Sequence, residues 1–152
     1  MPSDNVTPFR RPPKKPAVRQ QGGLGLKSHR GKVVLAHLLT IAAFLLNFFL
    51  TTVPWSFISL AVAVAAVLLV YTNRGEAMPW ANTHHEHALR TLIIGYAINV
   101  LASLLGMILG ALAIVGFYIT VAVTIWAIVR ALIGLVLGVM RKPIPNPKGW
   151  LV

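Results

Sequence analysis

The chain has 152 residues, of which 57% are hydrophobic and only 11% are charged. A soluble domain carries about a quarter charged residues, so this composition excludes a water-exposed globular surface. Lys and Arg number 14 against 3 Asp and Glu, and the absence of cysteine excludes disulfides, thiolate metal sites and cysteine nucleophiles. The sequence therefore predicts a small, basic, all-α integral membrane protein.

The N-terminal segment, residues 1–31, is basic and rich in proline and glycine. Residues 1–32 hold eight Lys and Arg but a single acid, Asp4. Since the segment has almost no apolar side chains to bury, we expect a disordered tail. Its positive region is too long for a secretory signal peptide, and no small-residue cleavage site follows the first apolar run.

Four apolar segments follow and define a transmembrane domain over 32–142. Residues 33–52 carry no charge, and a second apolar run covers 55–71. Residues 91–129 are also uncharged, which is too long for one helix across a hydrocarbon core about 30 Å thick. Because lipid offers no partner for backbone polar groups, the spans are expected to be helices that pack as a four-helix bundle. We place them at about 33–52, 55–72, 90–109 and 113–131, with the last two divided at Gly106, Gly110 or Gly116.

The basic residues predict the orientation of these spans. Four spans put both ends of the chain on one side of the membrane. The connections at 51–54 and 110–112 contain no Lys or Arg. The N-terminal tail and the 73–90 connection (Arg74, Arg90) do, and so does the C-terminal end, with Arg141 and Lys142 just before a proline-rich tail at 143–152 and Lys148 within it. The positive-inside rule then predicts that both termini lie in the cytoplasm. The membrane we expect for this multi-pass protein is the bacterial plasma (inner) membrane.

The run from Thr83 to His87 (Thr-His-His-Glu-His) supports two readings. His84 and His87 are three residues apart and would share a helix face, which makes them candidate metal ligands. Alternatively, Thr83 and Glu86 have the spacing of a capping box at the start of the third span, and we favour this reading. Glu86 and Arg90 are also spaced for an ion pair along one helix.

Four further polar residues fall inside the expected spans. His37 lies one turn into the first span, where it is a candidate haem ligand or a hydrogen-bond partner for a neighbouring helix. Asn47 and Asn99 each need a partner in hydrocarbon, which is either another helix or a substrate. Arg130 is either inside an extended fourth span and paired there, or at the interface with 131–140 lying along the membrane surface; we favour the interface.

The same residue types disfavour several functions. No Asp or Glu lies in any span, which argues against a proton pump or an ion-coupled transporter. We find no serine–histidine–acid set and no closely spaced carboxylates, so we expect no enzyme activity and no cofactor. Small residues recur at four-residue spacing and would let helices approach closely, within this chain or with another subunit. They are Ala61 and Ala65, Ala102, Gly106 and Gly110, and Gly134 and Gly138.

The order of these features resembles a family of small bacterial membrane proteins grouped as a domain of unknown function. That family is remotely similar to the chloroplast inner-envelope protein-import subunit. The matching residues are Leu35 to Leu38, His84 with Ala88 and Leu89, and the stretch from Arg130 to Pro147. His87 stands where such proteins usually carry Gln. The resemblance covers about 33–147 and implies a four-helix membrane bundle without an established activity.

These observations favour a structural or interaction subunit at the plasma membrane. Its basic tail would adhere to membrane lipids with anionic headgroups or dock a membrane-protein partner, a second copy being one such partner; nucleic acid is disfavoured. One alternative is a component that transports a small solute or translocates a polypeptide, supported by Asn47, Asn99 and Arg130. The other is a metal or haem protein that uses His37 and the histidines from His84 to His87.

Overall fold

A computed structural model describes residues 24–50, 56–75 and 77–151, and within these residues all regular structure is helical. The chain forms α1 (His29–Phe49), α2 (Ser56–Asn73), α3 (Pro79–Ile108), the one-turn 3₁₀ helix η1 (Gly110–Leu112) and α4 (Ala113–Val139). All four α-helices are long and apolar enough to cross a membrane. The prediction of an all-α, four-helix integral membrane bundle is therefore confirmed. Most of the basic tail expected over 1–31 lies outside the described residues.

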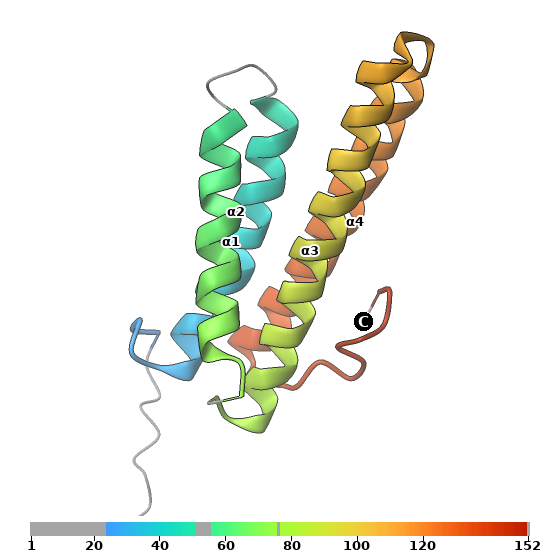
Figure 1. Cartoon of the computed structure of the whole chain (residues 1–152). Helices are drawn as coiled ribbons and strands as arrows, with labels where there is room; N and C mark the ends of the chain where they lie inside the picture. Colours follow the sequence, from blue (N-terminus) through green and yellow to red (C-terminus); the bar gives the residue numbers. More distant parts are fainter. Residues whose placement is uncertain (1–23, 51–55, 76, 152) are drawn as a thin grey trace, which may run out of the picture.

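The helices form two antiparallel hairpins, α1/α2 and α3/α4 (Figure 1). We call the end where α1 and α3 begin the basic end, and the opposite end, where η1 joins α3 to α4, the hairpin end. In Figure 1 the two hairpins meet at the basic end, drawn at the bottom, and spread apart toward the hairpin end. α4 packs against both α3 and α1, which joins the two hairpins.

The start of α1 follows from a local cap. The Ser28 hydroxyl accepts a hydrogen bond from the backbone N–H of Gly31 at 3.0 Å and donates one to the carbonyl of Gly25 at 2.7 Å. Serine is a favoured N-cap because its oxygen satisfies one of the free N–H groups of the first turn. The helix accordingly begins at His29, a few residues before the apolar run.

α3 begins eleven residues before the span expected at 90–109, so most of the polar connection at 73–90 is helical. Pro79 occupies the first turn, where its missing N–H costs nothing. The capping box expected at Thr83 and Glu86 is wrong, because Thr83 lies inside the helix and its hydroxyl donates to the Trp80 carbonyl at 2.7 Å. Glu86 instead pairs with Arg90 at 2.7 Å, as its spacing predicts.

α4 corrects the expectation for the end of the fourth span. The break between α3 and α4 falls at Gly110, one of three candidates, but α4 continues to Val139 rather than ending near 131. Residues 131–139 therefore extend the helix, and the expectation that 131–140 lies along the membrane surface is wrong. Arg130 is inside the helix and only 1% exposed.

The middle of the bundle is an apolar layer of small residues packed around one phenylalanine. Phe44 is fully buried, and its ring lies so close to Gly95 that a Cβ there would overlap it. Tyr96 stacks at 5.1 Å from Phe44 and donates its hydroxyl to the carbonyl of Ala43 at 3.1 Å. In α2 the buried alanines are Ala63 and Ala66, whereas Ala61 and Ala65 are exposed. Ala61 and Ala65 therefore do not pack within the chain, and their contact with another subunit stays a prediction.

Candidate functional site

Four of the polar residues predicted to be important meet at the basic end of the bundle. His37 from α1, His84 and His87 from α3 and Arg130 from α4 are each at most 1% exposed. We call His37, His84, His87 and Arg130 the buried polar cluster. The cluster fits because residue 134 is a glycine, since a Cβ at that position would overlap the His37 ring. Gly134 and Gly138 therefore let helices of this chain approach one another closely. This is the first of the two roles predicted for such residues, the other being contact with another subunit.

His37 and His84 form one half of the cluster. Nε2 of His37 lies 3.1 Å from Nδ1 of His84, and Nε2 of His84 lies 2.8 Å from the carbonyl of Lys142. A carbonyl only accepts, so His84 carries its proton on Nε2 and, as an uncharged ring, accepts from His37 at Nδ1. Nδ1 of His37 has no hydrogen-bond partner among the described residues. Two successive hydrogen bonds thus connect α1 to α3 and α3 to the residues that follow α4.

His87 and Arg130 form the other half. A guanidinium only donates, so Nη2 of Arg130 donates to Nδ1 of His87 at 3.0 Å. This assigns an uncharged ring to His87, with a proton on Nε2 that points to the Arg130 carbonyl at 3.3 Å. Nε of Arg130 donates to the hydroxyl of Thr91 at 3.0 Å, and the guanidinium lies 5.1 Å from the centre of the Trp126 ring.

No carboxylate of a described residue neutralises Arg130. Glu86 is the one acid in the part of the chain that the structure describes, and it pairs with Arg74 at 3.2 Å and with Arg90. Nη1 of Arg130 donates instead to the carbonyls of Gly149 at 2.6 Å and Leu151 at 2.9 Å. Hydrogen bonds from a charged donor are stronger than neutral ones, so these carbonyl dipoles stabilise the cation that the spans would otherwise expose to lipid.

The C-terminal segment at 143–151, which we call the strap, is therefore docked on the bundle. It turns back alongside the α3/α4 hairpin (Figure 1). Ile144 is 1% exposed and donates its N–H to the Thr83 hydroxyl at 2.9 Å, while Trp126 donates Nε1–H to the Trp150 carbonyl at 2.7 Å. Trp150 is itself 71% exposed, as expected for an aromatic anchor at the headgroup level.

The two candidate metal ligands, His84 and His87, belong to different halves of the buried polar cluster. His84 turns to α1 and the end of α4, whereas His87 turns to Arg130. Across the described residues no group of three or more histidines and acids is arranged to hold a metal ion. His85 is fully buried, and within the described part of the chain neither of its nitrogens has a partner. The arrangement binds a guanidinium and connects three helices.

Asn47 and Asn99 lie elsewhere, toward the hairpin end. Both line a cavity of about 530 Å³ between the two hairpins, together with Tyr96 and Thr120. Asn99 is 5% exposed and neither of its side-chain polar atoms has a partner among the residues described. Asn99 therefore has no helix partner among the described residues, and the other predicted alternative, a substrate, stays a prediction.

The sequence reasoning missed the meeting of the histidines with Arg130 and the roles of Thr91, Trp126 and the strap. One signal was available. α1 and α3 run away from the basic end and α4 runs toward it, so residues one to two turns inside the starts of α1 and α3 share a depth with residues of the last turns of α4.

No family model, curated protein or solved structure matches this chain. The resemblance to the family of bacterial membrane proteins described above stays a prediction. What the fold itself establishes is a multi-pass membrane protein whose four helices surround two separate groups of polar side chains.

Proposed function

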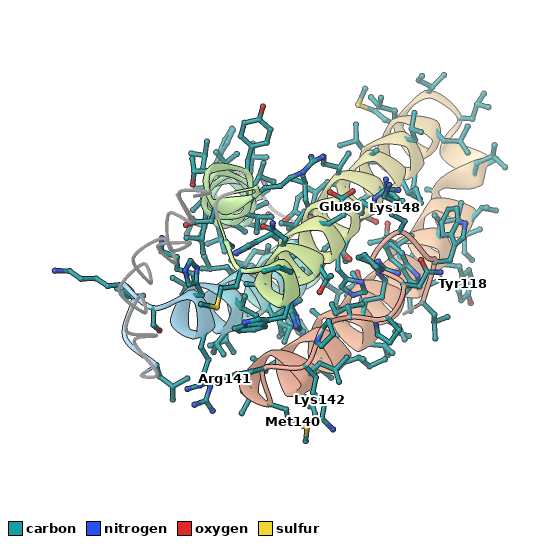
Figure 2. All side chains as sticks on the ribbon, turned by 90° about the horizontal axis from the view of Figure 1, so that it is seen from below. Glu86, Tyr118, Met140, Arg141, Lys142 and Lys148 are labelled. Carbon is teal, nitrogen blue, oxygen red and sulfur yellow. The ribbon has the colours of Figure 1, made fainter. Side chains whose placement is uncertain are left out.

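We propose that this protein is a structural or interaction subunit of a bacterial plasma membrane, with its basic end in the cytoplasm and bound to anionic headgroups. One observation carries the proposal: with Arg130 set aside, the described Lys and Arg residues gather at the basic end. They are Lys27, Arg30, Lys32, Arg74, Arg90, Arg141, Lys142 and Lys148. Figure 2 views this end and shows Arg141 and Lys142 at the end of α4.

Hydrogen bonds and an ion pair also join the helices to one another at the basic end. Nζ of Lys32 donates to the side chain of Asn73 at 2.6 Å, which joins the start of α1 to the end of α2. Arg74 pairs with Glu86 and so joins the end of α2 to α3. The end of α4 is joined through the Lys142 carbonyl to His84. Cations gathered at one end of the bundle suit an anionic membrane surface, which attracts about 1 kcal/mol per Lys or Arg near it.

An apolar layer favours this proposal over solute transport. The buried cluster around Phe44, Leu92, Val123 and Ala127 lies between the polar cluster at the basic end and the cavity at the hairpin end. A path through the bundle would have to separate these packed side chains. The proposal needs no such movement, since lipid and partner would bind the outside of the bundle.

Reporter fusions test the orientation. A reporter after Leu151 should be active in the cytoplasm, and one inserted at Ala111 should be active outside. The opposite pattern, or the same location for both reporters, would contradict the proposed topology.

Lipid retention tests the role of the cations. Five basic residues precede the described part of the chain, and replacing all five by Gln should remove about 5 kcal/mol of attraction at low salt. They are Arg10, Arg11, Lys14, Lys15 and Arg19. Purified protein should then retain less phosphatidylglycerol than the unaltered chain, and high salt should reduce the difference by screening. The matched control replaces five uncharged polar or proline residues of the same tail. Equal retention by the Gln variant and the unaltered chain would refute a role for these cations.

A further inference from the structure

Three cations from separate parts of the chain surround the Glu86 carboxylate at the basic end. Nε of Arg74, just after the end of α2, lies 3.2 Å from Oε2 of Glu86, and Nε of Arg90 donates to Oε1 at 2.7 Å. Lys148 in the strap is near enough to act on the same carboxylate electrostatically, and Figure 2 shows Glu86 and Lys148 in one region of this end. Three cations therefore share one carboxylate, which leaves two positive charges unmatched among these four side chains.

These cations keep donors that an anion from outside the chain can use. Both arginines face Glu86 through Nε, and neither Nη1 nor Nη2 of either arginine bonds to a described residue. Nζ of Lys148 likewise has no hydrogen bond within the described part of the chain. The side chains of Arg74 and Arg90 are 50% and 40% exposed, and Lys148 is exposed too, so these donors are accessible from outside. Guanidinium and ammonium groups are the side chains with which proteins bind phosphate oxygens.

An exposed apolar face of α3 continues from these cations toward the middle of the membrane. Arg90 is the last charged residue before the uncharged run at 91–129, so its guanidinium lies near the headgroup level. Ile93, Ala97 and Val100 follow Arg90 at helical spacing and share its side of α3. All three are exposed, Ile93 to 56% and Val100 to 54%. An anion held at Arg90 therefore has an open apolar surface beside it, on which an acyl chain can lie.

We propose that Arg74, Arg90 and Lys148 bind the phosphate group of one anionic phospholipid. Its acyl chains lie along the exposed face of α3 at Ile93 and Ala97. A zwitterionic headgroup brings its own cation to a region with unmatched positive charge and is disfavoured. The bound headgroup joins the end of α2 to α3 and the strap, so it links the two hairpins. This inference rests on the proposed function, which places anionic headgroups at the basic end, and it adds one site of fixed position that holds a single lipid.

Native mass spectrometry of the full chain in mild detergent counts the lipids that stay bound. The protein is titrated with dioleoylphosphatidylglycerol or dioleoylphosphatidylcholine, which share acyl chains and a phosphate but differ in net charge. The unaltered chain should bind one phosphatidylglycerol more tightly than any further copy and more tightly than phosphatidylcholine. Arg74→Gln and Lys148→Gln should each weaken this first binding step about fivefold, the effect of one cation near an anionic headgroup. Lys142→Gln is the matched control, because it removes the same charge at a position that Figure 2 shows apart from Glu86, and it should leave the first step nearly unchanged.

Glu86→Gln distinguishes a lipid site from ion pairs that only join the helices. This variant removes the carboxylate that competes with phosphate for both guanidinium groups, so it should strengthen the first binding step several-fold. Weaker binding in Glu86→Gln, equal binding of the two lipids, or equal affinities in Lys148→Gln and Lys142→Gln would each overturn the proposal. Displacement of phosphatidylglycerol by an equal concentration of inorganic phosphate would do so as well, by assigning the donors to a free anion.

The Gln variant of the five N-terminal cations separates this inference from the proposed function. It should lose part of its total lipid while keeping the first binding step, because none of those cations belongs to the site. A tail variant that retains all its lipid would refute the role of the tail alone, whereas unchanged binding in both Arg74→Gln and Lys148→Gln would refute the site alone.

Discussion

Replacing Arg130 by Met should release the strap while leaving the four helices packed. Arg130 Nη1 donates to the carbonyls of Gly149 and Leu151, and these two bonds join the far end of the strap to α4. The other attachments are the Ile144 N–H on Thr83 and the Trp150 carbonyl on Trp126, and neither involves Arg130. Methionine keeps most of the apolar length of the arginine side chain, so the change removes chiefly the donors.

The size of the effect follows from these two bonds. A hydrogen bond to a charged group contributes about 1.5–3 kcal/mol, so the pair contributes about 3–6 kcal/mol. Leu151 is 62% exposed, which lets its carbonyl regain water once the strap leaves. We therefore expect the lower figure, about 3 kcal/mol, which raises the opening equilibrium of the strap about 100-fold.

Hydrogen exchange followed by mass spectrometry measures this opening directly. The Gly149 amide bonds to the Asn146 carbonyl in the part of the strap that Arg130 holds, so peptides covering 146–151 should exchange about 100-fold faster in Arg130→Met. The Ile144 amide keeps its own bond to Thr83 and should change less. Arg90→Met is the matched control, because Arg90 pairs with Glu86 and has no hydrogen bond to the strap. Unchanged exchange in the strap would refute the assignment of Arg130 as its anchor. Equal acceleration in peptides from α1 would refute the claim that the effect is local.

Substitutions at Gly134, Thr124 and Phe44 test the packing argument, with unfolding followed by SDS titration of the detergent-solubilised protein. Gly134→Ala should lower the free energy of unfolding by about 1–3 kcal/mol, since its Cβ overlaps the His37 ring, whereas Gly110→Ala has open space and should change it little; equal effects would contradict the close approach. Thr124→Val should leave stability unchanged or raise it by up to about 1 kcal/mol, because it removes a buried hydroxyl that bonds to no described residue; a clear loss would reveal a partner for that hydroxyl. Phe44→Ala should cost about 3–5 kcal/mol and Phe44→Leu much less, as the ring fills the centre of the apolar layer; a small loss for alanine would show that the layer collapses around the gap.

The helices were predictable because each contains a long uncharged run, and lipid leaves no other solution for the backbone of that run. The residues at which the helices begin and end were harder to predict. α3 extends back to Pro79 through polar residues, since a helix that leaves the hydrocarbon no longer needs apolar side chains. Composition therefore locates the part of a helix inside the membrane, while caps such as Ser28 and Pro79 determine where the helix begins.

The side-chain partners were not predictable from the same patterns. The distance between His37 and His84 depends on how two helices rotate about their axes, which the hydropathy of nearly uniform apolar runs does not specify. The strap illustrates a second limit. Pro143, Pro145 and Pro147 correctly indicate that no helix continues there, and outside a helix the carbonyls of Gly149 and Leu151 accept hydrogen bonds from Arg130. Those free acceptors are what a buried arginine without a carboxylate requires.

The polar side chains at the two ends of the molecule differ in their hydrogen bonding. At the basic end, Arg130 uses its donors on His87, Thr91 and the strap, so the hairpins are held together there by directed bonds as well as by packing. At the hairpin end the helices spread apart, and the Asn99 amide lacks a partner among the described residues (Figure 1). The directed bonds of Arg130 favour one arrangement at the basic end, although Nδ1 of His37 and both ring nitrogens of His85 have no partner among the described residues. At the hairpin end no such bond holds the Asn99 side chain, and an unsatisfied group lowers the cost of any arrangement that supplies a partner. Any change of shape on binding should therefore open or close the hairpin end about the fixed basic end, with the apolar layer at Phe44 as the boundary between them.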